Sequence, residues 1–297
     1  GTELLGKLAE KKRPVFTSCC PAWVTYMEKE YGSSLAHLSS AKSPMGMFGA
    51  VAKTYYPEKA GVDVKDIVTV AVMPCTAKKF EAARPEMGRN GMADVDIVLT
   101  TRELIKLIKY VGLSLQNLPE SEFDSPLGTG TGAGAIFGAT GGVMEAALRT
   151  VYEVITNETL PKIDFHEVRG FEGIRESTIT INGRDIHIAV AHTLKNARTI
   201  MKQVKAGTSP YDFIEIMACP GGCIGGGGQP IGTTNAIRKK RMASLYQIDH
   251  SLPLRKSHEN PEIQTLYKEF LGEPLSEKSH ELLHTHYHKV DKPYEFR

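Results

Sequence analysis

Two hydrophobic patterns alternate along the chain. Short runs of apolar and β-branched residues are typical of strands, and between them lie segments in which apolar residues recur every three or four positions, as in amphipathic helices. The runs of strand length are Val15–Ser18, Asp66–Met73, Val95–Thr100, Asp185–Ala191 and Phe213–Met217. Asp66–Met73 is rich in β-branched residues, and we expect it to be a buried strand.

The helical segments follow these strands in turn. Alternation of strands and helices is typical of an α/β fold, and 297 residues allow one large domain or two smaller lobes. We therefore predict two lobes of mainly parallel sheets flanked by helices. The predicted helices are Glu3–Lys11, Ala22–Tyr31, Thr76–Met87, Arg102–Val111, Gly142–Thr156 and Lys195–Ala206.

The last fifth of the chain has a different character. From about Arg238 it is basic and then polar, with helical patterns at Glu262–Leu271 and Glu277–His288. We expect residues 239–297 to form a peripheral helical strap on a main domain of residues 1–238. The chain has no initiator Met, so we also expect it to be truncated or processed at its amino end.

Composition and charge exclude several classes of protein. With 41% hydrophobic and 24% charged residues and a formal net charge of +2, the chain reads as an ordinary globular protein without a nucleic-acid partner. No run approaches the roughly 18 apolar residues of a membrane span, and the first residues carry no signal peptide. We expect no membrane insertion and a cytoplasmic location, with a periplasmic one left open.

The five cysteines stand at the carboxyl ends of predicted strands. Cys19 and Cys20 follow the first, Cys75 the second, and Cys219 and Cys223 the last. Open α/β sheets place their ligands at these ends, so we expect one shared site, and four thiolates bind either zinc or an iron-sulfur cluster. Adjacent residues point in opposite directions, which leaves Cys19 or Cys20 outside the ligand set. Prolines beside three of the cysteines favour iron and sulfur.

Glycine is concentrated in two segments. Gly221–Gly228 contains six glycines in eight positions, which indicates backbone passing close to a bulky object. Gly128–Gly142 is a weak match to a nucleotide-binding loop, because no clear strand precedes it and the third glycine is missing. A tight turn beside a cofactor or another backbone is the preferred interpretation of that segment.

Three long motifs resemble the signatures of FeFe hydrogenases. They are Thr17–Trp23 (TSCCPAW), Met73–Glu81 (MPCTAKKFE) and Glu215–Pro230, which includes MACPGGC and GGGQP. The similarity extends to Gly132–Arg149, and the carboxyl-terminal part resembles the small subunit that some relatives encode separately. The resemblance implies reversible oxidation of H2 to protons and electrons.

The family's cofactor is the H-cluster, in which a 4Fe-4S cubane is joined through one cysteine to a two-iron subsite with CO, cyanide and a bridging dithiolate. The resemblance implies that this cluster lies in the cleft between the lobes, with Cys20, Cys75, Cys219 and Cys223 as cubane ligands and Cys223 as the bridge. Lys78 matches the lysine that hydrogen-bonds a cyanide. The other residues that match the cofactor pocket are Met73, Met217, Phe137, Gly138, Ser43 and Pro44.

Cys19 matches the family's free thiol, which passes protons to the dithiolate amine. Glu3 and Ser39 match outer members of the same relay. The family has a further relay acid just upstream of Glu3, which a partner chain or another segment would have to supply. The resemblance also implies H2 and protons as substrates, maturation proteins, and a ferredoxin or electron-transfer subunit as partner.

Two other interpretations compete with an active hydrogenase. His280–His284 (HELLH) fits the HExxH motif of zinc peptidases, and His286 and His288 follow closely, although that motif needs a third ligand and a cleft. A hydrogenase-like protein could instead keep only the cubane for sensing or cluster assembly. Retention of both Cys19 and Lys78 argues against that alternative.

Overall fold

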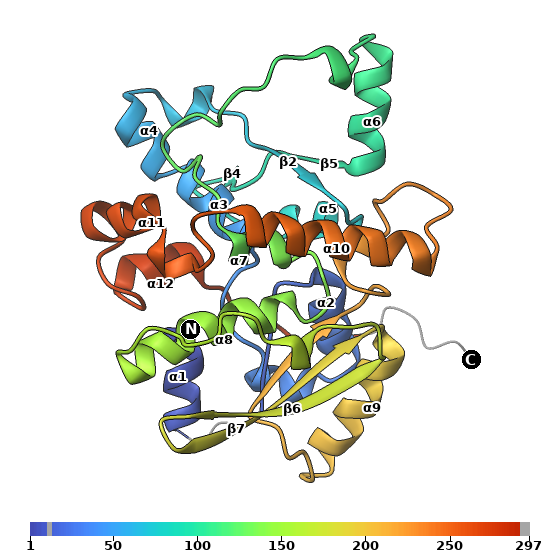
Figure 1. The fold of residues 1–297 in the computed structure, drawn as a ribbon. Coiled ribbons are helices and arrows are strands. Elements are labelled where there is room, and N and C mark those ends of the chain that lie inside the picture. Colours follow the sequence, from blue (N-terminus) through green and yellow to red (C-terminus); the bar gives the residue numbers. More distant parts are fainter. Residues whose placement is uncertain (11–13, 292–297) are drawn as a thin grey trace.

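The computed structural model describes residues 1–10 and 14–291 and has an α/β fold (Figure 1). Lys11, where the first predicted helix was expected to end, lies outside the described residues. The helices are α1 (Thr2–Ala9), α2 (Pro21–Glu30), α3 (Pro44–Ala52), α4 (Tyr55–Ala60), α5 (Ala77–Ala82), α6 (Thr101–Tyr110), α7 (Gly132–Ile136), α8 (Gly142–Thr156), α9 (Leu194–Lys205), α10 (Asn235–Ser251), α11 (Pro261–Leu266) and α12 (Glu277–Leu283). The strands are β1 (Val15–Phe16), β2 (Val70–Met73), β3 (Gly88–Arg89), β4 (Met92–Ala93), β5 (Ile97–Thr100), β6 (Ile174–Ile181), β7 (Arg184–His192) and β8 (Phe213–Met217).

The larger sheet has the strand order β1-β8-β7-β6. Strands β1, β8 and β7 are parallel, and β6 is antiparallel to β7. The sequence analysis missed β6, although Asn182-Gly183 between β6 and β7 is a typical hairpin turn in which both residues have positive φ. The sheet is therefore mixed, and its parallel part brings the carboxyl ends of β1 and β8 side by side.

Helices cover both faces of this sheet, because successive residues of each strand point to opposite sides. On one face, Val15 and Ile188 join a core formed with α1 and α8. On the other, Phe16 and Ile214 join Trp23 and the core formed with α2 and α9. Figure 1 shows this sheet and its helices as the lower half of the molecule.

A second, two-stranded sheet pairs β2 with β5 in parallel. The expectation that Asp66–Met73 is a buried strand is wrong. Only Val70–Met73 is a strand, and Val70 and Val72 are 51% and 44% exposed. Alternate residues of β2 face the inner side, where Met73 packs against a core that contains Met45.

Helices α5 and α12 are shorter than predicted, and four helices were missed, namely α3, α4, α7 and α10. Helix α5 ends at Ala82 because Pro85 cannot continue it, and α12 ends at Leu283, after which the chain is extended. Helix α10 was not predicted because its polar and basic residues show little helical periodicity. It covers the expected domain boundary at residues 238 and 239. Among the described residues, no helix is long and apolar enough to cross a membrane.

A buried ion pair fastens α10 to α8. The guanidinium of Arg149 is fully buried and donates to both carboxylate oxygens of Asp249, at 2.7 and 2.9 Å. It also donates to Glu145 at 2.8 Å. Because both carboxylates are buried, their charges depend on these partners for compensation.

Substitution of Arg149 tests this connection. Arg149→Leu should lower the free energy of unfolding by about 3–5 kcal/mol, since it leaves buried carboxylates without their partner. Arg198→Ala, on the exposed face of α9, should change it by no more than about 0.5 kcal/mol. Denaturant titration followed by circular dichroism measures both values, and equal effects would contradict the structural role of the pair.

Candidate metal centre

Each cysteine follows a strand, as the sequence predicts. Cys20 is the N-cap of α2 and comes four residues after β1, and Cys75 comes two residues after β2. Cys219 comes two residues after β8, and Cys223 begins a single 3-10 turn. All five cysteines are free thiols.

Electrostatic coupling shows that these thiols lie close together. Burial raises the pKa of Cys223 to about 12, and the neighbouring thiols of Cys20, Cys75 and Cys219 raise it as well. Burial likewise raises the pKa of Cys219, with Cys20 and Cys75 adding to the shift. Thiolates that repel one another in a buried place need a strongly positive partner, which a metal cluster supplies.

The spacing of the thiols does not fit a single zinc ion. Ligands of tetrahedral zinc–sulfur centres lie about 3.8 Å apart, as follows from bonds of about 2.3 Å. Among the described residues, no three cysteine sulfurs lie within 4.8 Å of one another. Four separated thiols suit a larger cluster with an iron at each corner, so the donor set fits a 4Fe-4S centre.

The glycine run brings Cys223 against Cys75. The backbone N–H of Gly228 donates to the carbonyl of Pro74 at 2.9 Å. A Cβ atom on Gly228 would stand 2.7 Å from the backbone nitrogen of Cys75, closer than real contacts allow. Only glycine permits this approach of the two segments.

The opposite side of the run is held by the second glycine-rich segment. Ile224 N–H donates to Gly138 O and Thr140 N–H to Gly221 O, both at 3.0 Å. Gly222 has a φ of 91° and packs against the backbone of residues 138–140, where a side chain would clash. Gly128–Gly142 therefore supports the cysteine loop through backbone contacts. This agrees with the preferred interpretation, a tight turn beside a cofactor or another backbone, rather than with a nucleotide-binding loop.

His192 and Glu215 also support the two glycine-rich segments. Neither residue was predicted from the sequence to do so. The Nδ1 atom of His192 accepts from Gly221 N–H at 3.3 Å, which leaves Nε2–H to donate to the carbonyl of Phe171. Burial raises the pKa of Glu215 to about 7, although its carboxylate accepts from Gly141 and Met144 N–H at the start of α8. Isolated polar residues in or beside a strand carry no sequence signal for such contacts.

Lys78 lies beside the cysteines, buried in the first turns of α5. Its Nζ atom donates to Glu81 at 2.6 Å and to the carbonyl of Cys19 at 3.2 Å. The positive charge of Lys78 acts against the rise in pKa of Cys19 and Cys223. An ammonium is thus available next to the thiols.

Cys19 and the expected relay residues line one cavity of about 510 Å³, together with Pro44 and Phe137. Burial raises the pKa of Cys19 well above that of a free thiol, and Cys20 adds to the rise. Cys19 is therefore protonated at neutral pH.

Glu3 and Ser39 are in direct contact in this cavity. The hydroxyl of Ser39 donates to Glu3, and Ser40 N–H donates to the same carboxylate at 2.8 Å. Burial opposes ionisation of Glu3, but these hydrogen bonds and the charge of Lys7 outweigh it and lower its pKa to about 2. The structure thus joins two residues that are 36 positions apart in the chain.

The remaining expected pocket residues are spread around the centre. Ser43 is fully buried and caps α3 by accepting from Gly46 N–H, and Pro44 follows it. Met217 is buried at the end of β8, whereas Met73 is half-buried at the end of β2.

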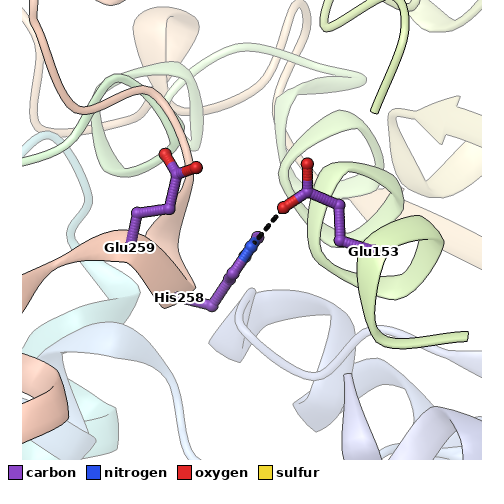
Figure 2. A group of neighbouring side chains, drawn as sticks. All are labelled: Glu153, His258 and Glu259. Carbon is purple, nitrogen blue, oxygen red and sulfur yellow. Dashed lines mark hydrogen bonds and ion pairs between the residues drawn. The ribbon is translucent and has the colours of Figure 1, made fainter. Parts of the chain in front are cut away.

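Two other groups resemble metal sites. Among the described residues, the HELLH residues do not bring three ligand atoms within 4.8 Å, which argues against a zinc peptidase. Figure 2 shows Glu153, His258 and Glu259, whose ligand atoms do lie within that distance. Lys256 donates to both carboxylates at 2.7 and 2.8 Å, so an ammonium already compensates their charge. We assign no metal there.

Comparison with known proteins places the chain in a family. The profile described as "Iron only hydrogenase large subunit, C-terminal domain" matches residues 1–227, and "Iron hydrogenase small subunit" matches residues 235–290. The chain therefore belongs to the iron-only, or FeFe, hydrogenase family, which confirms the resemblance in its motifs.

Curated relatives include both hydrogenases and other proteins. The NADP-reducing hydrogenase subunit HndD of Solidesulfovibrio fructosivorans is 52% identical over 97% of this chain and 51% of the relative, and Iron hydrogenase 1 of Clostridium pasteurianum is 47% identical over 93% and 49%. The chain spans about half the length of these two relatives. Protein NAR1 of Arabidopsis thaliana is 34% identical over 97% of this chain and 64% of its own length.

Solved hydrogenase structures share the fold. The structure of a variant of apo FeFe hydrogenase HydA1 from Chlamydomonas reinhardtii is 44% identical in sequence and has a TM-score of 0.85. The match covers 98% of this chain and 81% of the HydA1 chain. The structure of HydA(deltaEFG), described in terms of stepwise H-cluster assembly, is 45% identical, with a TM-score of 0.84 over 97% and 80%. These matches confirm the predicted α/β class.

Adjacent glycines allow a matched test of the cysteine loop. Gly228→Ala should lower the free energy of unfolding of the iron-free chain by about 1–3 kcal/mol, because its Cβ would meet backbone atoms of Pro74 and Cys75. It should also reduce the iron retained after anaerobic reconstitution. Gly227→Ala is the control, since Gly227 is exposed and its Cβ would meet only side-chain atoms of Thr76. Indistinguishable variants would contradict this packing.

Proposed function

We propose that the chain is the catalytic part of an FeFe hydrogenase, which interconverts H2 with two protons and two electrons. The observation that carries this proposal is a fifth thiol, that of half-buried Cys19, which lies beside the four-cysteine set and whose carbonyl accepts from the ammonium of Lys78. A protein that only held a cubane would need the four ligands alone.

Cys20, Cys75, Cys219 and Cys223 would hold the cubane, with Cys223 also reaching the two-iron subsite. When bound, this H-cluster supplies the redox chemistry and the site at which H2 is split or formed. The mutual coupling of the four thiols and the clearance that the glycines provide support this assignment. Residues 1–238 would form the catalytic domain, and residues 239–297 its small-subunit-like strap.

The protein's own chemical task in this proposal is proton movement. Cys19 keeps its proton at neutral pH and borders the cavity that also reaches Ser39 and Glu3. A thiol is acidic enough to pass a proton on and regain it from a neighbour. Water in the cavity, or an acid supplied from outside this chain, would complete the path between Cys19 and Ser39.

Lys78 would hold the anionic side of the cofactor. An ammonium forms charge-assisted hydrogen bonds with anions, and these bonds are strongest where water is excluded. Lys78 is buried, and one of its present partners is the Cys19 carbonyl. The same side chain would therefore position both the cofactor and the Cys19 backbone.

Electrons would enter through the cubane from a ferredoxin or an electron-transfer subunit. The relative HndD is named as a subunit of an NADP-reducing hydrogenase, which supports a multi-subunit assembly. Maturation proteins would supply the two-iron subsite.

A cluster-assembly role is the second candidate, because proteins named cytosolic iron-sulfur assembly component are 31% identical over 95% of the chain. Infrared spectra after maturation separate the two roles. Bands of metal-bound CO and cyanide, together with H2 production from a reduced dye, support the hydrogenase. A chain that binds a four-iron cluster but shows none of these bands after maturation supports the assembly role.

Substitutions of Cys19 test the proposed relay. Cys19→Ala should remove nearly all turnover, and Cys19→Asp should retain more activity than Cys19→Ser because a carboxyl group still carries a titratable proton. H2 evolution assays measure this order on equal amounts of matured protein to which the family's upstream relay acid has been restored, because a relay broken at its next member would make every variant inactive. If Cys19 were only a packing residue, Ala would be the mildest change and the buried carboxylate of Asp the harshest.

Lys78→Asn should reduce the amount of two-iron subsite severalfold while leaving the cubane, because the anionic ligand loses its cationic partner. Glu81→Gln is the matched control, since it alters the partner of Lys78 but keeps the ammonium. The intensity of the CO and cyanide bands measures the subsite, and iron analysis measures the cubane. Full band intensity and activity in Lys78→Asn would refute this role.

A further inference from the structure

The carboxylate of Glu3 has a second hydrogen-bonded neighbour besides Ser39. The hydroxyl of Ser40 donates to Glu3 Oε1 at 3.0 Å, and the same hydroxyl oxygen lies 2.8 Å from Nδ1 of His284. Because the single hydroxyl proton of Ser40 points to the carboxylate, Nδ1–H of His284 donates to Ser40. An unbroken chain of hydrogen bonds thus runs from His284 to Glu3.

Backbone pairing holds His284 in this place independently of its ring. Thr285 N–H donates to Ser40 O and Lys42 N–H donates to Leu283 O, both at 2.8 Å, and Ala41 forms an antiparallel bridge with His284. The segment after α12 is therefore paired with residues 40–42. Replacement of the imidazole leaves these backbone bonds in place.

A second imidazole lies beside His284, toward the surface. The rings of His284 and His280 stack in parallel with their centroids 4.7 Å apart, and His286 lies 6.4 Å from His280. His284 is half-buried, whereas His280 and His286 are exposed. His284 thus borders the cavity that contains Glu3 on one side and the exposed His280 on the other, within the HELLH segment that the other chemistry leaves unused.

The charges around His284 suit a proton carrier. Burial lowers the pKa of His284, the carboxylate of Glu3 acts to raise it, and His280 and Lys7 act to lower it. His284 is therefore mainly neutral at pH 7 and can accept a proton and release it again. Glu3 supplies the opposite charge that stabilises the protonated form.

We propose that His284 is a proton-transfer residue that connects Glu3 with solvent through Ser40, so that the carboxyl-terminal segment contributes a branch to the catalytic proton relay. The branch rests on the proposed hydrogenase function. It assigns a chemical role to the strap beyond packing.

Inward transfer follows the hydrogen bonds. A proton from solvent binds Nε2 of His284, the Nδ1–H bond breaks as that proton moves to Ser40 Oγ, and Ser40 gives its own proton to the carboxylate of Glu3. One proton has moved from solvent to Glu3, and His284 is left neutral with its proton on Nε2. Rotation of the hydroxyl and exchange of the imidazole proton with water restore the first state, and H2 oxidation uses the same steps in reverse.

The coupling between Glu3 and His284 can be measured without any cofactor. NMR titration of the histidine ring protons in the iron-free chain gives the pKa of His284, assigned with the His284→Ala variant. Glu3→Gln should lower this pKa, because it removes the negative charge that stabilises the imidazolium. An unchanged pKa of His284 would overturn the proposed connection.

Turnover of the matured chain tests the transfer itself. His284→Ala should slow H2 evolution by about threefold to tenfold, less than the usual effect of losing a sole acid–base residue, because Glu3 keeps its contact with the cavity. Added imidazole should restore part of the rate by carrying protons to Ser40. His288→Ala should turn over at the normal rate.

The outcomes separate the branch from the proposed function. A normal rate in His284→Ala, or a slow rate that imidazole does not restore, would overturn the branch while leaving an active hydrogenase. Absence of H2 evolution in the unsubstituted matured chain, extended at its amino end by the family's upstream relay acid, would instead refute the proposed function. The NMR titration would then still decide whether Glu3 and His284 are coupled.

Discussion

The structure depends on the close approach of half-buried cysteines whose thiolate forms repel one another. Cys20, Cys75, Cys219 and Cys223 come from the ends of three strands in two sheets, and each of the shifted thiols is affected by others of the set. Backbone packing forces this proximity, since Gly228 leaves no room for a side chain between its segment and Cys75. A cluster of positive metal ions would turn the repulsion into binding energy, which links the fold of this family to its cofactor.

Much of this arrangement could be predicted from local patterns. Helix α8 and strand β8 were predicted at their observed bounds, because their hydrophobic periods are strong and their ends are marked by glycine or turn residues. The gathering of the cysteines was predicted because three strands each end in Cys, and parallel strands share a carboxyl edge. The number of missing side chains in Gly221–Gly228 predicted backbone that passes close to a bulky object, and the structure places two other backbone segments against this run.

Features that arise only from tertiary contacts could not be predicted. Burial of β2 was overestimated because a run of Val and Ile looks the same whether one face or both faces are covered. Helix α10 was missed because its stability comes from a few buried contacts, among them the pair of Asp249 with Arg149, rather than from an apolar stripe. His192 and Glu215 act on backbone N–H groups of distant segments, which a single sequence does not reveal.

Adjacent cysteines allow the most direct test of the central claim, which is that one thiol of the pair ligates the cubane and the other stays free. Iron analysis and Mössbauer spectra should be compared for Cys19→Ala and Cys20→Ala after anaerobic reconstitution with iron and sulfide. We predict that Cys19→Ala retains a complete 4Fe-4S cluster, whereas Cys20→Ala loses it or retains an incomplete one. A complete cluster in Cys20→Ala together with loss of the cluster in Cys19→Ala would contradict the account.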